Sequence, residues 1–310
     1  MPSFRTLYVS DTLRAVLNPG DAKDPACMIT FESRGIVGHQ DERFFAAPLA
    51  SPTKPIVHVI PKRDTWYQEP DLPDLITAVR PFLSSDAFAY GSSMGGYAVA
   101  RFADQMGVSR AIALSPQFSL DRKHTPFEKR WSGQAASTRF LYDDTRPSRK
   151  ATLWVLADHT TKAEAQHSLL IGKEGPTEVI DTPGALHGCG RALREAGILK
   201  PMVESFVAGA ENANDIRAQI AERMPSTSYG LLLQSKALKG RARLKLLRQA
   251  INANPRNEEA LRQCARQHIR MGQLKDAQIV LNLMRPKVPK GLREHFLDAA
   301  RAANFNQQIF

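Results

Sequence analysis

The chain has 310 residues, of which 43% are hydrophobic and 24% charged, an ordinary composition for a globular protein. No apolar run approaches the ~20 residues of a membrane helix, and the N-terminal residues lack the basic start and apolar core of a signal peptide, so we expect neither. Three cysteines, Cys27, Cys189 and Cys264, are too few and too scattered for a disulfide framework or a metal site. We therefore expect a cytoplasmic protein that needs no metal or other cofactor.

The net charge of +11 is unevenly distributed. Residues 236–310 contain 16 Lys and Arg against 5 Asp and Glu, whereas residues 1–235 contain 26 of each kind. This asymmetry indicates two parts with different roles. A basic C-terminal part favours an acidic protein or another anionic partner; the alternative is an ordinary solvated basic surface.

Short strands and amphipathic helices alternate through the first 210 residues. The predicted strands are 6–10, 14–18, 26–33, 55–60, 87–93, 110–115, 151–158 and 177–183, and the predicted helices are 71–83, 94–107, 161–172 and 191–208. This alternation predicts an α/β fold with a mostly parallel sheet covered on both faces. Ligands of such sheets bind beyond the carboxyl ends of the strands, so we expect the chemistry there.

From about residue 212 the pattern becomes entirely helical. The segment 260–289 resembles one tetratricopeptide repeat, with small or apolar residues at Leu261, Cys264, Ala265, Gly272, Leu274, Ala277, Leu281 and Met284 followed by Pro289. A partial copy ending at Ala250 and Pro255 fits 34 residues earlier, although its first half fits poorly. We expect residues 1–211 to form the α/β domain and residues 212–310 a basic helical domain. The alternative is an irregular helical extension unrelated to such repeats.

A serine stands between two glycines where a strand becomes a helix. Residues 91–95, "GSSMG", match the G-x-S-x-G nucleophile elbow, with Ser93 as the nucleophile between Gly91 and Gly95. The turn is tight, and glycine relieves the clash at both flanking positions. The backbone N–H of Met94 is then a candidate oxyanion donor. The alternative is a phosphate-binding turn, but there is neither a GxGxxG motif nor a following lysine.

A serine nucleophile needs a base, and the base needs an acid that orients it. His187 follows the last predicted strand and precedes a helix, which makes it the predicted base. Asp158, at the carboxyl end of the strand 151–158, is the favoured acid, and Asp181 is its rival. His159 is a lesser alternative base, because a neighbour in a strand end points the opposite way.

Residues 5–210 resemble the α/β-hydrolase family through "GSSMGG", "LWVLAD" and "ALHGCG". The resemblance implies a three-layer sandwich with an eight-stranded sheet whose first two strands form an antiparallel edge. It also implies a second oxyanion donor, the N–H of Glu32 or Ser33. There is no HGGG run here, and charged Glu32 and Arg34 are unusual beside an oxyanion hole. Arg34 either binds a substrate carboxylate or phosphate, or pairs with Glu32.

The resemblance also implies a cap-like insertion at residues 117–150, hereafter the insertion segment. Its aromatic residues alternate with charges, which suits a polar substrate such as an acylated sugar stacked on Trp131, unless Trp131 only anchors the segment. We predict a serine hydrolase that cleaves a carboxylic ester; a peptidase or an acyltransferase would use the same residues. The alternative is a non-catalytic scaffold whose basic helices bind a protein or anionic partner, or another copy of the chain. Nucleic acid is disfavoured, because no aromatic-basic platform accompanies the charge.

Overall fold

The protein is described by a computed structural model over residues 4–18, 25–35, 54–145, 148–284, 288–303 and 305. The chain divides into two compact units, Met1–Ala218 and Gln219–Phe310. The division falls inside α7 (Ala213–Arg223), a few residues beyond the expected boundary at residues 211 and 212. In the described part of the chain, no helix combines the length and the apolar character needed to cross a membrane.

The first unit is built on one eight-stranded sheet with strand order β1-β2-β4-β3-β5-β6-β7-β8. The strands are β1 (Arg5–Val9), β2 (Leu13–Asn18), β3 (Ala26–Phe31), β4 (Ile56–Pro61), β5 (Leu83–Ser92), β6 (Arg110–Leu114), β7 (Thr152–Ala157) and β8 (Thr177–Asp181). Only β2 runs against its neighbours, so β3 to β8 form a continuous parallel array. The predicted fold class is confirmed, including the antiparallel edge.

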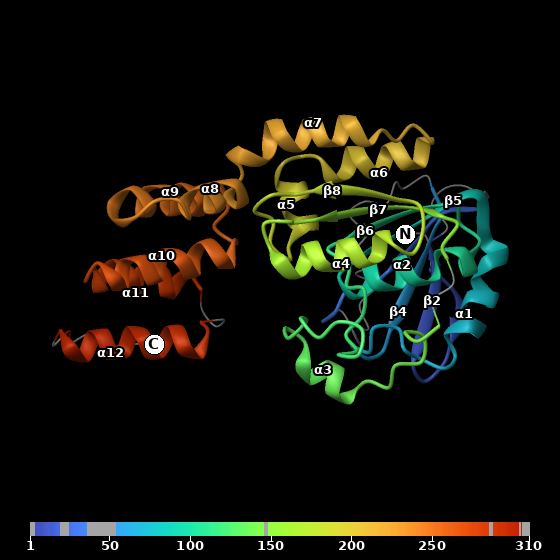
Figure 1. The fold of residues 1–310 in the computed structure, drawn as a ribbon, viewed down its shortest axis with the longest axis horizontal. Helices are drawn as coiled ribbons and strands as arrows, with labels where there is room; N and C mark the ends of the chain where they lie inside the picture. Colours follow the sequence, from blue (N-terminus) through green and yellow to red (C-terminus); the bar gives the residue numbers. More distant parts are fainter. Residues whose placement is uncertain are drawn as a thin grey trace. The chain divides into compact units, whose positions relative to one another are not determined.

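Helices cover both faces of this sheet because side chains of a strand alternate between the faces. In β5, Ala87 and Ala89 join the core under α1 (Leu72–Val79) and α2 (Met94–Met106). Phe88 points the other way and meets Phe206 of α6 (Leu199–Ala208), with 5.3 Å between ring centroids. Figure 1 shows α2 and α4 (Lys162–Gly172) on one side of the strands and α6 on the other. The carboxyl ends of β5, β7 and β8 thus lie at one edge between two helical layers.

Two details differ from the sequence prediction or extend it. The long helix predicted over residues 191–208 is two helices, α5 (Cys189–Glu195) and α6, because Gly197 adopts a left-handed φ of 69° between them. The insertion segment connects β6 to β7 and, in its described residues, contains one short helix, α3 (Ser132–Ser137). Most of the segment is therefore irregular chain held by side-chain contacts.

The second unit consists of α8 (Ser228–Ser235), α9 (Gly240–Ala253), α10 (Glu258–Arg270), α11 (Leu274–Leu283) and α12 (Lys290–Ala302). Helices α8 and α9 pack as a pair, as do α10 and α11, and within this unit the pairs and α12 form successive layers (Figure 1). Helix α11 begins 34 residues after α9. The small residues Ala265 and Ala277 are fully buried, and Gly272 takes a φ of 70° in the turn between α10 and α11.

Candidate active site

The turn from β5 into α2 presents Ser93 in a strained backbone conformation, with φ 54° and ψ −118°. The two glycines make this turn possible. A Cβ on Gly91 would lie 2.3 Å from the carbonyl oxygen of Gly95, and a Cβ on Gly95 would lie 2.1 Å from the carbonyl oxygen of Phe31. Both distances are far inside van der Waals contact, so any side chain at either position would force the backbone apart. The sequence "GSSMG" therefore folds as a tight strand-to-helix turn with the geometry of a nucleophile elbow.

Ser93 is in hydrogen-bond contact with His187. Its Oγ lies 2.8 Å from Nε2 of the imidazole, and Nδ1 of the same ring lies 3.0 Å from Oε1 of Glu164. Because a carboxylate can only accept, Nδ1 carries the proton and Nε2 is left to accept from the serine hydroxyl. The ring is therefore held in the tautomer that a general base requires.

The carboxylate at the imidazole comes from Glu164 in α4 and not from Asp158, the residue favoured from the sequence. Asp158 is buried and accepts hydrogen bonds from the backbone N–H of Leu186 (2.8 Å) and of Thr160 (2.9 Å). Leu186 has a φ of 54°, so Asp158 fixes the strained residue immediately before His187. Asp158 thus positions the loop that carries the histidine and does not contact the ring.

The rival acid, Asp181, is also placed elsewhere. Its Oδ1 accepts the backbone N–H of His159 at 2.9 Å, at the edge of β8. Neither Asp181 nor His159 lines the pocket around Ser93. Of the residues predicted as nucleophile, base and acid, the structure brings together Ser93 and His187, and the sequence reasoning missed Glu164.

Glu164 is fully buried and shares Oε1 between two partners, His187 and Arg130 of the insertion segment. Burial alone would raise the pKa of this carboxyl. The hydrogen bonds and charges of His187 and Arg130 outweigh it and hold the pKa below its usual value. Glu164 is therefore ionised at neutral pH, in a state that accepts from His187.

Arg130 extends this arrangement to a second buried pair. Its guanidinium also contacts both carboxylate oxygens of Glu128, and His167 Nε2 lies 2.9 Å from Glu128 Oε2. His167 Nδ1 accepts the backbone N–H of Phe118, so Nε2 is the protonated nitrogen that donates to Glu128. Burial raises the pKa of Glu128, but the hydrogen bonds from His167 and Arg130 lower it to about 2. The insertion segment is thereby pinned to α4 by buried, charge-assisted hydrogen bonds.

The structure separates the two candidates for the second oxyanion donor. The N–H of Glu32 donates to the carbonyl of Val59 at 3.2 Å, as part of the sheet, and is therefore occupied. Ser33 lines the pocket beside Ser93, so its N–H remains the candidate together with that of Met94 at the start of α2. A Cβ on Gly95 would also press on the carbonyl of Glu32, at 3.1 Å. The same glycine thus lets the end of β3 approach the elbow closely.

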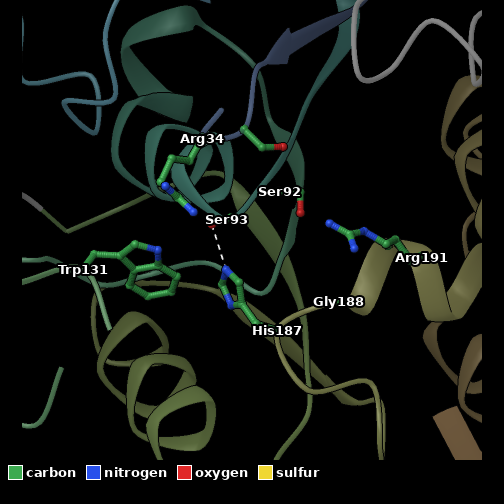
Figure 2. A pocket seen from close by; sticks show the side chains of 9 residues that line it. Arg34, Ser92, Ser93, Trp131, His187, Gly188 and Arg191 are labelled. Carbon is green, nitrogen blue, oxygen red and sulfur yellow. Dashed lines mark hydrogen bonds between the residues drawn. The ribbon is translucent and has the colours of Figure 1, made fainter. Parts of the chain in front are cut away.

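The serine opens into a pocket of about 230 Å³. Its lining residues come from the loop after β3, from the elbow, from the insertion segment and from the start of α5: Ser33, Arg34, Ser92, Ser93, Trp131, His187, Gly188, Gly190 and Arg191. Figure 2 shows Trp131 on one side of the Ser93–His187 pair and the side chains of Arg34 and Arg191 directed towards the serines. The sequence analysis did not single out Arg191, which lies four residues beyond His187.

Trp131 forms one wall of this pocket but is only 8% exposed. The guanidinium of Arg130 lies 4.4 Å from the ring centroid, and the rings of Trp66 and His187 lie at 5.8 and 4.8 Å. With these neighbours, little of the indole face remains for stacking a sugar ring. Its contacts fit the alternative role, which is to anchor the insertion segment beside the histidine.

The sheet order, the elbow after β5 and the histidine after β8 define an α/β-hydrolase fold with a serine–histidine–carboxylate site. Among the described residues, no group of three or more His, Cys, Asp or Glu side chains is arranged to hold a metal ion.

Comparisons with known proteins add the following. No protein-family model and no curated protein matches the chain. Among solved structures, the chain is similar to the capsule O-acetyltransferase of Neisseria meningitidis serogroup A, with 15% identity and a TM-score of 0.47 over 65% of this chain and 93% of that one. It is also similar to the fluorophosphonate-binding serine hydrolase F of Staphylococcus aureus, with 15% identity and a TM-score of 0.42 over 68% of this chain and 98% of that one. A sugar hydrolase of Lactococcus lactis gives 14% identity and a TM-score of 0.41 over 71% and 99%. These similarities are too distant to indicate which reaction this chain catalyses.

Proposed function

We propose that the protein is a serine hydrolase that cleaves a carboxylic ester through an acyl-enzyme. The observation that supports this proposal is the continuous relay from Ser93 Oγ through His187 to Glu164, at 2.8 and 3.0 Å, beside an open pocket. A structural role alone would not require a strained serine with an imidazole at hydrogen-bond distance from its hydroxyl.

In the first step, Ser93 Oγ attacks the ester carbonyl carbon while His187 Nε2 takes the hydroxyl proton. The carbonyl oxygen becomes an oxyanion that accepts from the N–H groups of Met94 and Ser33. Glu164 stabilises the imidazolium formed at this stage. When the tetrahedral intermediate collapses, the bond to the alcohol breaks and His187 returns the proton to the leaving oxygen.

In the second step, a water molecule loses a proton to His187 and attacks the acyl carbon. The bond between the acyl carbon and Ser93 Oγ then breaks, His187 returns the proton to Oγ, and the acid is released. If an acceptor alcohol replaces water, the same residues transfer the acyl group, and a peptide bond in place of the ester would give a peptidase.

A polar substrate is favoured by the pocket lining, which contains three serines, two arginines and one histidine. We place the protein in the reducing cytoplasm because Cys27, Cys189 and Cys264 form no disulfide.

The test is intact-mass analysis after treatment with a fluorophosphonate. The wild type should gain one adduct, Ser93→Ala should gain none, and His187→Ala should react much more slowly. Ser92→Ala is the matched control, because this neighbouring serine lines the same pocket and should leave labelling intact. Absence of an adduct on well-folded wild type would contradict the proposal and favour the non-catalytic scaffold.

We also propose that the second unit is tetratricopeptide-like and associates with another copy of the chain or with a protein partner. The 34-residue offset between α9 and α11 and the buried small residues of α10 and α11 support the repeat. On α11, Ile279 and Leu283 are four residues apart on one face of the helix and are 55% and 60% exposed, and adjacent exposed apolar side chains of this kind favour an interaction surface. Sedimentation of the full chain and of the Ile279→Asp variant tests self-association; if both are monomeric, that part of the proposal is wrong.

A further inference from the structure

We infer that the substrate carries an anionic group, a carboxylate or a phosphate, close to the ester, and that Arg34 and Arg191 bind it. This inference rests on the proposed ester hydrolysis and adds the charge of the substrate. The two arginines are far apart in the sequence, one in the loop after β3 and the other in α5, yet both line the pocket of Ser93.

The described lining of the pocket carries a net positive charge, unlike the first 235 residues as a whole. Among the lining residues that the structure describes there are two arginines and no Asp or Glu. Residues 1–235 as a whole contain 26 basic and 26 acidic side chains, so the positive lining does not follow from the composition of this part of the chain. A cluster of one charge sign in a concave site concentrates ligands of the opposite sign.

Neither arginine is used by the fold. Both side chains are exposed, and no ion pair of Arg34 or Arg191 occurs within the described residues. In particular, Arg34 does not pair with Glu32, the partner considered in the sequence analysis. Some arginines of the same unit are used in this way: Arg110 pairs with Glu211 and Arg217 with Glu178. The guanidinium groups at the pocket therefore remain available to a ligand.

The geometry places the anion beside the reacting bond. Figure 2 shows Arg34 and Arg191 approaching the serines from different sides of the pocket, with both guanidinium groups directed inwards. Ser33 and Ser92 also line the pocket, and their hydroxyls can donate further hydrogen bonds to such a ligand. A guanidinium fork binds carboxylate or phosphate oxygens in a bidentate manner, which fixes the orientation of the ligand as well as its charge.

The test compares charged and uncharged esters in matched pairs. One pair places the charge on the acyl side: the para-nitrophenyl monoester of adipate and the same compound with its free carboxyl methylated. The other places it on the alcohol side: para-acetoxyphenylacetate and its methyl ester. For each pair, the ratio of kcat/KM values is measured for the wild type and for Arg34→Gln, Arg191→Gln and the double variant.

We expect the charged-to-neutral ratio of at least one pair to fall about tenfold or more in the double variant, equivalent to ~1.4 kcal/mol. The pair that responds shows which side of the ester carries the anion. Arg194→Gln is the matched control, because Arg194 is exposed on the same helix but does not line the pocket; it should leave both ratios unchanged. In the wild type, about 1 M salt should also reduce the preference, because it shortens the Debye length to about 3 Å.

Two failures are distinguishable. If fluorophosphonate labels Ser93 and neutral esters are hydrolysed, but neither ratio changes by more than about twofold in folded variants, the inference is wrong and the proposed function stands. If there is neither labelling nor hydrolysis, the proposed function is wrong and the inference falls with it. Arg34→Lys and Arg191→Lys should keep part of the preference, because they retain the charge without the planar fork.

Discussion

Replacing Glu164 by Gln removes the charge at the imidazole while keeping the size of the side chain and an oxygen that can accept from Nδ1. The relevant quantity is the stabilisation of the imidazolium that forms during the reaction. At the observed 3.0 Å, two unit charges interact by about 5 kcal/mol at an effective dielectric constant of about 20. Arg130 contacts the same oxygen and offsets part of this, so we expect a loss of about 3 to 5 kcal/mol. This corresponds to a fall in kcat of roughly 10² to 10⁴.

The matched comparison is Asp158→Asn, which changes the carboxylate favoured from the sequence. Asp158 receives backbone N–H groups on both oxygens, and an amide retains only one acceptor oxygen. We expect a lower melting temperature and a fall in kcat of about tenfold, because the loop before His187 loosens while the ring keeps its carboxylate.

The assay is steady-state hydrolysis of para-nitrophenyl acetate, with circular dichroism to show that each variant is folded. Burst measurements separate acylation from deacylation, and Glu164→Gln should slow both because the imidazolium forms in each step. The reasoning is refuted if folded Asp158→Asn loses as much activity as Glu164→Gln, or if Glu164→Gln keeps more than about a tenth of the wild-type kcat.

Three further predictions concern stability and use urea unfolding. Gly95→Ala should lower the free energy of unfolding by at least about 3 kcal/mol, because the new methyl group would meet the carbonyl of Phe31. Gly133→Ala in α3 is the control: its methyl group meets nothing within 4 Å, so the change should stay within about 1 kcal/mol. Equal effects would contradict the close approach of Gly95 to Phe31. Burial lowers the pKa of His58 to about 3, so below pH ~6.5 the unfolded chain binds a proton that the native chain excludes, and stability falls as the pH drops. His58→Gln should lose about 1.4 kcal/mol less than the wild type between about pH 7.5 and 5.5, and identical losses would show that the native histidine protonates freely. Arg130→Gln should cost about 1 to 3 kcal/mol after allowing for the partial exposure of the arginine, with Arg130→Lys recovering part of it; an unchanged midpoint would mean that its contacts contribute nothing.

The parts of the candidate site whose placement can be predicted from the sequence are those encoded by neighbouring residues. The elbow depends on two glycines within five residues, and the steric reason for both is local, so Ser93 is identified without knowledge of the fold. His187 follows from its place after the last strand of an alternating pattern. The sheet itself is predictable because buried parallel strands are nearly continuous apolar runs.

The position of Glu164 in the site could not be predicted from its sequence neighbours. The acid is expected at a strand end, and this expectation favours Asp158. Asp158 is at the expected position but accepts hydrogen bonds from backbone N–H groups and not from the imidazole. A signal was nevertheless present in α4. Its buried face is formed by Glu164, His167, Ser168 and Ile171, whereas Leu169 is 62% exposed. A helix that buries polar residues at i, i+3 and i+4 and exposes a leucine departs from amphipathic patterning, and such departures mark functional positions.

The second pocket arginine could not be predicted for a different reason. Arg191 lies in the first turn of α5, about a hundred residues beyond the turn that carries Ser93, and only the folded chain brings the two together. The end of α5 before Gly197 was also not predictable, because the helical pattern of the sequence continues through this glycine into α6.

Arg130 belongs to the insertion segment, whereas the carboxylate that it contacts belongs to α4 and lies beside His187, the base of the proposed reaction. The part of the chain that borders the pocket therefore also contributes a positive charge to the carboxylate of the proposed proton relay. Variation in this segment among proteins of similar design would alter substrate choice and basicity together. Grafting a foreign insertion onto this sheet would accordingly need a replacement cation for Glu164. Exchanging residues 117–150 without one would leave that buried carboxylate with the neutral imidazole as its hydrogen-bond donor and with no cation, as far as the described part of the chain is concerned.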